Sequence, residues 1–311
     1  MLRSTLLYLS NQPRVFKFVR NNRLAKTFAR RFVAGETVEE ALAVARALNA
    51  KGISASLDEL GESVTNEREA RATRDSYLNI LDRIAQERLN ANVSVKLTAL
   101  GLDIAEELCV THMQDLLERA RHHRTFVRID MESSEYTERT LRLFEERFFP
   151  SFREQVGIVL QSCLLRTWTD TQRAIELKAR VRICKGAYRE PPSVAFPDKN
   201  DVDANYVKCM HALMSDGNYP GIATHDVRII EEAKRYARAN GIDAKRFEFQ
   251  MLYGVRRDLQ GSLRAEGWGM RVYVPFGTQW YPYLMRRLAE RPANMMFLTG
   301  NVVREAFSRR R

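Results

Sequence analysis

From residue 50 onward, short apolar or β-branched runs alternate with longer amphipathic stretches of helix-forming residues. This alternation is typical of parallel β/α units, in which a helix carries the chain from one strand back to the start of the next. Eight runs predict strands, namely 53–57, 93–98, 126–131, 157–161, 181–184, 221–224, 247–251 and 272–274.

A helix-forming stretch follows each of these runs. The pattern favours an α/β fold, a closed (βα)8 barrel of the TIM type, because closure removes the exposed edges of an open parallel sheet. We expect residues 46–311 to form this barrel as a single catalytic domain and residues 1–45 to form an N-terminal helical segment. Thr37 with Glu40 three residues later predicts the start of one extra helix.

The composition is that of an ordinary folded globular protein, with 45% hydrophobic and 29% charged residues in a chain of 311. No apolar run approaches the roughly 18 residues that cross a bilayer, and the opening segment lacks the features of a signal peptide. We therefore expect a soluble protein.

The four cysteines form no CxxC pair, and no histidine lies at metal-ligand spacing from them. The sequence also has no HExxH motif, so no metal site and no disulfide framework is predicted. A reducing compartment is the simplest expectation.

The basic charge gathers at the N-terminus, where no acidic residue precedes Glu36 although the whole chain has a net charge of +11. Apolar residues interleave with these cations in a loosely helical pattern. Three interpretations stay open: a helical layer packed on the barrel, a helix resting on an anionic membrane surface, and an organelle transit peptide. Nucleic-acid binding is disfavoured, because the usual motifs are absent.

The predicted strands end in polar residues. In a barrel the chemistry lies at the carboxyl ends of the strands, and burying charged groups there without a partner or ligand is costly. Each residue alone could belong to a structural polar cluster, but together they predict a site. They are Lys96, Asp130, Glu132, Gln161, Arg182, Lys185, His225, Gln250 and Tyr273.

These side chains suit a large anionic cofactor with a polar edge. Neither GxGxxG after a strand nor GxxxxGK[ST] is present, which disfavours a Rossmann fold and a P-loop. Arg182, Lys185 and His225 can donate charge-assisted hydrogen bonds to phosphates, and Gln161 and Gln250 can recognise a heteroaromatic edge.

Tyr283, Arg286 and Arg287 lie three and four residues apart in the last helical stretch and so share one helix face. A pair of arginines can hold a carboxylate through parallel hydrogen bonds that lysine would not reproduce. A solvated basic face is the alternative interpretation. The hypothesis is a small carboxylate substrate bound above a flat cofactor.

Nine segments between residues 60 and 290 together resemble the proline dehydrogenase (proline oxidase) family. They are LGE at 60–62, SVKLTALG, RIDMES, VLQS, RICKGAYRE, ATHD, FEFQMLYG, RVYVPFG and YLMRRLAE. The resemblance implies a (βα)8 barrel that binds FAD, oxidises L-proline to Δ1-pyrroline-5-carboxylate and passes electrons to a membrane quinone.

The resemblance also implies roles for individual residues. On the substrate side, Arg286, Arg287 and Lys96 would lie at the carboxylate, Tyr273, Tyr283 and Leu252 would surround the proline ring, Asp130 would support the cations, and Glu62 would pair with Arg286 as a gate. An intact Tyr283 favours proline over hydroxyproline. On the cofactor side, contacts would come from Gln161, Arg182, Lys185, Gly186, Ala187, His225 and Gln250.

No further domain follows Arg311 in this sequence, which favours a single-function enzyme whose product goes to a separate pyrroline-5-carboxylate dehydrogenase. We expect a cytoplasmic location, with peripheral contact at the inner membrane face through the basic N-terminus as an open option. The matrix side of mitochondria is the alternative.

Two other hypotheses stay open at this point. Lys185 at a strand end could form a Schiff base in an aldolase-like enzyme, with Arg286 and Arg287 binding a phosphate or carboxylate. The net charge could instead serve a basic module that binds nucleic acid or membrane.

Overall fold

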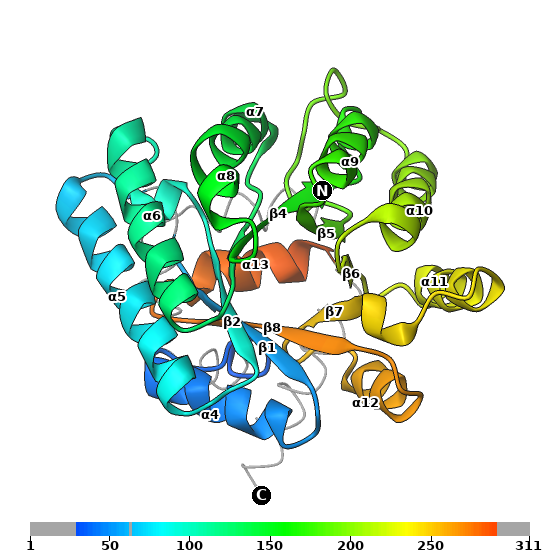
Figure 1. Cartoon of the computed structure of the whole chain (residues 1–311), viewed down its shortest axis with the longest axis horizontal. Coiled ribbons are helices and arrows are strands. Elements are labelled where there is room, and N and C mark those ends of the chain that lie inside the picture. The colour runs from blue at the N-terminus through cyan, green and yellow to red at the C-terminus, as the bar shows by residue number, and fades with distance from the viewer. Residues whose placement is uncertain (1–28, 62–63, 291–311) are drawn as a thin grey trace, which may run out of the picture.

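The computed structural model describes residues 29–61 and 64–290, with side chains up to Met285 in the last helix. Eight parallel strands form a closed barrel in which each strand pairs with its neighbours in sequence and β8 pairs with β1 (Figure 1). The strands are β1 Ser54–Glu59, β2 Ala91–Val95, β3 Val127–Ile129, β4 Val156–Gln161, β5 Arg180–Cys184, β6 Gly221–Ala223, β7 Glu248–Leu252 and β8 Met270–Phe276.

The predicted barrel and its eight strands are confirmed, with small differences at the strand ends. The largest concerns β2, predicted to reach Thr98 but ending at Val95. Leu97 has helical backbone angles, and the 3₁₀ turn η1 (Thr98–Leu100) follows it. Lys96 therefore lies just beyond the strand, at the mouth of the barrel.

Helices surround the strands in a ring (Figure 1). Most continue the predicted helical stretches, although the segment after β3 is divided by a π-helical turn. The helices are α4 Val38–Asn49, α5 Glu67–Gln86, α6 Glu106–His122, α7 Ser134–Leu143, the π-helical turn η2 Phe144–Phe148, α8 Phe149–Phe152, α9 Thr167–Glu176, α10 Lys199–Asp216, α11 Val227–Ala239, the 3₁₀ turn η3 Ala244–Arg246, α12 Arg257–Ala265 and α13 Trp280–Glu290.

The last helix does not take a place in the ring. Only three residues separate the end of β8 from α13, so α13 begins at the carboxyl ends of the strands. It runs across the centre of the ring in Figure 1. Helix α4 packs against both β1 and β8, where the eighth helix of a regular barrel would lie. Because α4 occupies that position, α13 is left at the barrel mouth.

Helix α4 starts as predicted. The Thr37 side chain accepts a hydrogen bond from the Glu40 backbone N–H, and the Glu40 side chain accepts one from the Thr37 N–H. This capping box satisfies two backbone donors at the helix start. The helix runs across the proposed boundary at residue 45, which stays a prediction. Residues 1–28, including most of the basic N-terminal segment, lie outside the described residues.

Along several strands, apolar and polar side chains alternate. Apolar residues such as Val93, Val181 and Val272 are fully buried and belong to the main hydrophobic core. The intervening polar residues bond across the barrel to strands that are not their neighbours, so they point inward. The barrel therefore has an apolar exterior beneath its helices and a strongly polar interior. No helix in the described ranges is long and apolar enough to span a membrane.

Candidate active site

Arg182 occupies the centre of the polar interior. Its side chain is 8% exposed, and its guanidinium donates to Asp130 at 2.7 Å, to Gln250 at 2.6 Å and to the Ser94 hydroxyl at 3.1 Å. These partners come from β7, β2 and the end of β3, so one cation joins strands on several sides of the barrel. An ion pair this deeply buried is stabilised only when such additional hydrogen bonds are present.

Tyr273 extends this network toward the mouth. Its hydroxyl donates to the second carboxylate oxygen of Asp130 at 2.8 Å, and the Arg182 guanidinium lies 5.2 Å from its ring centroid. Burial, together with the charges of Asp130 and Asp58, raises the pKa of Tyr273 well above its usual value. The phenol is therefore protonated at neutral pH, so it donates hydrogen bonds and does not act as a base.

Gln250 connects this centre to the amino-terminal end of the barrel. Its side-chain oxygen accepts from Arg182, and its nitrogen donates at 2.7 Å to Glu248, which also accepts from Arg271 at 2.6 Å. Arg271 lowers the pKa of Glu248, although burial acts in the opposite direction. Both polar atoms of the Gln250 amide are thus committed to protein partners.

Lys96 lies at the mouth with its side chain 10% exposed. Its ammonium group is 3.6 Å from the carboxylate of Asp58, which is fully buried. Lys96 directly follows β2, so it lies at the carboxyl end of the barrel. A lysine anchored in this way can attract an anionic substrate group without moving.

Gln161 at the end of β4 is buried, and its amide nitrogen donates at 2.9 Å to the backbone carbonyl of Glu132. The Glu132 carboxylate accepts from the Thr98 hydroxyl at 2.6 Å and from the Thr98 N–H at 3.2 Å. These bonds fix the loops after β2 and β3 relative to β4.

Lys185 lies between two carboxylates, with its ammonium 2.5 Å from Asp203 and 3.1 Å from Asp226. Lys185 lowers the pKa of both aspartates, against the effect of their partial burial. The amine is thus engaged by two carboxylates, whereas a lysine that forms a Schiff base must present its amine to a carbonyl substrate. These contacts disfavour the aldolase hypothesis.

His225, after β6, accepts a 3.0 Å hydrogen bond at Nε2 from the backbone N–H of Leu252. The neutral ring then carries its proton on Nδ1, where it can donate. Gly186, after β5, has φ of +106°, and a Cβ at this position would lie 2.4 Å from Cys163 Sγ. The backbone at Gly186 thus passes Cys163 more closely than any residue with a side chain could.

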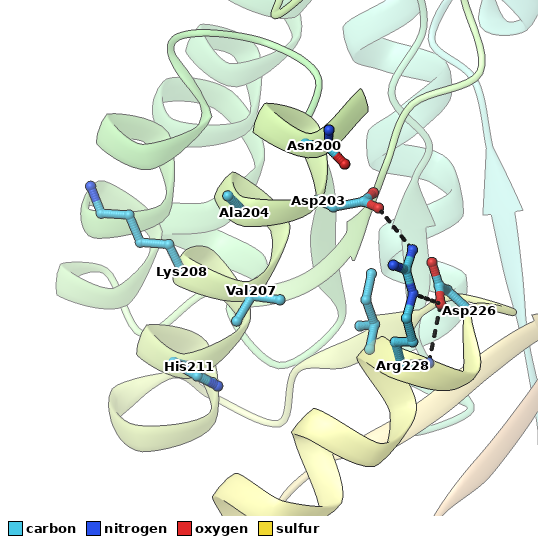
Figure 2. A pocket seen from close by; sticks show the side chains of 9 residues that line it. Asn200, Asp203, Ala204, Val207, Lys208, His211, Asp226 and Arg228 are labelled. Carbon is cyan, nitrogen blue, oxygen red and sulfur yellow. Dashed lines mark hydrogen bonds and ion pairs between the residues drawn. The ribbon is translucent and has the colours of Figure 1, made fainter. Parts of the chain in front are cut away.

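A groove of about 530 Å³ lies between α10 and α11, next to Lys185 (Figure 2). Arg228 extends along it and contacts Asp203 at 3.7 Å and Asp226 at 3.5 Å, the two carboxylates that also hold Lys185. The Arg228 side chain is 79% exposed. At this end of the groove, Lys185 and Arg228 thus share the carboxylates of Asp203 and Asp226.

Tyr283 lies on α13, and its side chain is buried. The helix carries Arg286 and Arg287 one turn further on, but their side chains lie outside the described part of the structure, as does Glu62. Ala187 follows Gly186 and is half-buried. The structure thus brings Lys96, Asp130, Arg182, Gln250 and Tyr273 into one region, while Lys185 and His225 lie on the adjoining rim.

The sequence analysis did not identify several residues of the interior network. Ser56, Ser94, Asp58, Glu248 and Arg271 all hold the predicted site residues or their partners. The sequence feature that could have identified them is the position of each polar residue among apolar neighbours within a strand. Within the described residues, no group of three or more His, Cys, Asp or Glu side chains could hold a metal ion.

The chain matches the family model described as "Proline dehydrogenase" over residues 41–300. It is 40% identical to proline dehydrogenase 1 of Bacillus subtilis over 98% of this chain and 100% of that protein. It is 38% identical to proline dehydrogenase of Deinococcus radiodurans over 98% of each.

Among solved structures, proline utilization A (PutA) of Bdellovibrio bacteriovorus inactivated by N-propargylglycine matches with a TM-score of 0.79 and 27% identity. That match covers 85% of this chain and 32% of the PutA chain, so this chain spans about a third of that protein.

Proposed function

This chain belongs to the proline dehydrogenase family, and on that premise we propose that it transfers hydride from L-proline to FAD and releases Δ1-pyrroline-5-carboxylate. Its place in proline catabolism follows from the family. One observation carries the finer proposal: Lys96 is held by Asp58, and Tyr273 is held by the Asp130–Arg182 pair, at the carboxyl ends of the strands, where α13 begins.

The substrate carboxylate binds to cations on two sides of the mouth. Lys96 approaches from the barrel, and Arg286 and Arg287 approach from α13 as a pair that can form parallel hydrogen bonds. Glu62 would pair with Arg286 and close the entrance over the bound substrate. Fixing the carboxylate in this way sets one ring carbon beside the nitrogen in a constant position for transfer.

Apolar and aromatic groups enclose the proline ring. Tyr273 and Tyr283 supply ring faces from β8 and α13, and Leu252 supplies an aliphatic wall from the end of β7. The Tyr273 hydroxyl is held by Asp130 at 2.8 Å, so its ring has a fixed orientation. The nearby cations also favour the neutral amine, which is the form of proline that can lose hydride.

The residues of the rim fit FAD. Lys185 and the Nδ1–H of His225 are donors suited to phosphate or ribityl oxygens, and the backbone at Gly186 and Ala187 is proposed to contact the cofactor beside them. The groove along α10 offers space for the nucleotide end (Figure 2). When bound, FAD supplies the hydride acceptor.

Arg182 and Gln250 are bonded to each other, so they contribute to the proposed cofactor site mainly through the fixed charge of Arg182. Gln161, at the end of β4, lies beside the loop after β5, because a Cβ at Gly186 would be 3.3 Å from its side-chain oxygen. Because Arg182 is held by Asp130 and Gln250 in the buried interior, its guanidinium is fixed in position and would not have to reorganise when negative charge develops nearby.

A membrane quinone is the proposed electron acceptor, and a separate pyrroline-5-carboxylate dehydrogenase would take the product. The basic N-terminal segment would hold the enzyme at the cytoplasmic face of an anionic membrane. Co-sedimentation with anionic liposomes tests this location. Full-length protein should pellet and a chain lacking residues 1–28 should not, whereas equal behaviour of both forms would contradict it.

The visible absorption spectrum tests the catalytic proposal. Purified protein should show the two bands of oxidised flavin, and anaerobic L-proline should bleach them, while D-proline should not. Lys96→Met should retain the bands yet bleach more slowly at low proline concentration. A protein that stays colourless after reconstitution with FAD, or flavin that L-proline leaves oxidised, would overturn the proposal.

A further inference from the structure

A second cavity lies at the opposite end of the barrel from the candidate active site. It has a volume of about 650 Å³ and opens where the loops α5–β2, α6–β3 and α8–β4 meet the amino-terminal ends of the strands. Four arginines line it, Arg88, Arg124, Arg180 and Arg271, against a single carboxylate, Glu154. Arg271 reaches the interior network through Glu248, whereas Arg88, Arg124, Arg180 and Glu154 take no part in the proposed catalytic site.

Arg88 and Arg124 are supplied by equivalent positions in two successive β/α units. Each follows the end of a helix and has a left-handed backbone, with φ of 51° and 53°. Glycine is the usual residue at such positions, because a side chain is unfavourable there. Neither arginine makes a side-chain hydrogen bond or ion pair with any side chain that the structure describes.

Arg180 has a buried N–H donor without an acceptor among the described residues. One terminal nitrogen lies 3.8 Å from the Glu154 carboxylate, which is 75% exposed, and its buried Nε has no acceptor among the described residues. The guanidinium also lies 5.3 Å from the Phe126 ring centroid, which restricts its movement. Arg180 is therefore held in place while some of its donors still lack a strong acceptor.

The arginines that lie on the strands beside this cavity add to its positive charge. Arg271 is engaged by Glu248, but the buried Arg128 hydrogen-bonds only to the backbone carbonyls of Ile158 and Arg180 among the described residues. Several like charges around one cavity repel one another, and an anion that enters it would relieve this repulsion.

We propose that this cavity is a binding site for a small polyanion of the phosphate class, held chiefly by Arg88, Arg124 and Arg180. Guanidinium groups match phosphate oxygens in pairs, and three such groups around a polar cavity provide the donors that a polyphosphate or phosphate ester requires. The exposed Glu154, 3.8 Å from Arg180, competes with the ligand for this guanidinium.

Isothermal titration of the flavin-loaded, full-length protein with inorganic pyrophosphate at low ionic strength tests the site. Arg124→Gln should weaken binding about tenfold, and Arg88→Gln should act in the same direction, because each removes a charge-assisted contact. Glu154→Gln should tighten binding severalfold, since it removes the competing carboxylate. Arg71→Gln, an equal loss of charge on an exposed part of α5, should leave the affinity within twofold.

Thermal unfolding without ligand verifies that each variant is folded, and none of these exposed side chains supports the core. Absence of pyrophosphate binding to the wild-type protein would overturn the proposal. Binding that survives in Arg88→Gln/Arg124→Gln would also overturn it, because the anion would then occupy another site. Inorganic phosphate, titrated in parallel, distinguishes a single-phosphate site from one that needs two linked phosphates.

Discussion

The hydroxyl of Tyr273 donates a 2.8 Å hydrogen bond to one carboxylate oxygen of Asp130, whose other oxygen accepts from Arg182 at 2.7 Å. Three strands are tied together by this carboxylate, since Tyr273 lies on β8, Arg182 on β5 and Asp130 just after β3. The aromatic ring proposed to face the substrate is therefore held by a buried charge.

Asp130→Asn should destabilise the protein by about 3 kcal/mol, because a buried Arg182 would lose its anionic partner. Tyr273→Phe should cost only about 1 kcal/mol, since it removes one hydrogen bond to a carboxylate that keeps other partners. Urea unfolding followed by tryptophan fluorescence measures both changes. Glu107→Gln, in an exposed ion pair with Arg147, is a control expected to leave the stability nearly unchanged. Equal losses for Asn and Phe would contradict this account of the network.

The sequence predicts those parts of the fold that depend on local pattern. The eight strands and the capping box at Thr37 involve residues adjacent or three apart, so their signals lie within one segment. The polar strand ends were also visible, because a charged residue beside an apolar run is conspicuous.

The interior network could not be predicted, because its contacts join residues far apart in the sequence. Arg182 meets Ser94 across 88 positions and Tyr273 meets Asp130 across 143. Which inward side chains meet depends on the stagger of the strands around the closed barrel, and no single segment encodes that stagger. The sequence therefore predicts cofactor contacts for Arg182 and Gln250. It could not predict the hydrogen bond between these two side chains, which the structure shows.

Lys185→Gln should change the dependence of stability on pH. Lys185 depresses the pKa of Asp203 and Asp226 in the folded protein, so these groups stabilise the fold above their unfolded pKa, about 3.9, and lose that contribution as pH falls through the folded values. The difference in unfolding free energy between wild type and variant should thus be largest above about pH 5 and shrink toward pH 2. A constant difference across this range would show that the two carboxylates are not coupled to Lys185.

Arg286→Lys should raise the KM for proline at least about tenfold while FAD remains bound, because lysine cannot reproduce the forked contact with a carboxylate. Steady-state kinetics and the flavin absorbance of the same preparation measure the two quantities. Arg68→Lys, on an exposed part of α5, is the matched control and should not change KM. A KM within about threefold of wild type, less than about 1 kcal/mol, would remove Arg286 from the proposed carboxylate site.

Gly186→Ala tests whether the turn after β5 must be glycine. The new methyl group would lie 2.4 Å from Cys163 Sγ, on a backbone with φ of +106°. We expect a loss of about 2–3 kcal/mol in unfolding free energy, together with weaker retention of FAD.

The double variant Gly186→Ala/Cys163→Ala separates the two causes of that loss, the collision with the sulfur and the left-handed backbone. Removing the sulfur relieves the collision but leaves the strained backbone, so the double variant should recover only part of the stability, with a coupling of about 1 kcal/mol. Gly261→Ala is the control, because Gly261 lies within α12 with nothing within 4 Å of an added Cβ, and alanine there should stabilise the protein slightly. Full recovery in the double variant would assign the whole effect to the collision, whereas no recovery would assign it to the left-handed backbone alone.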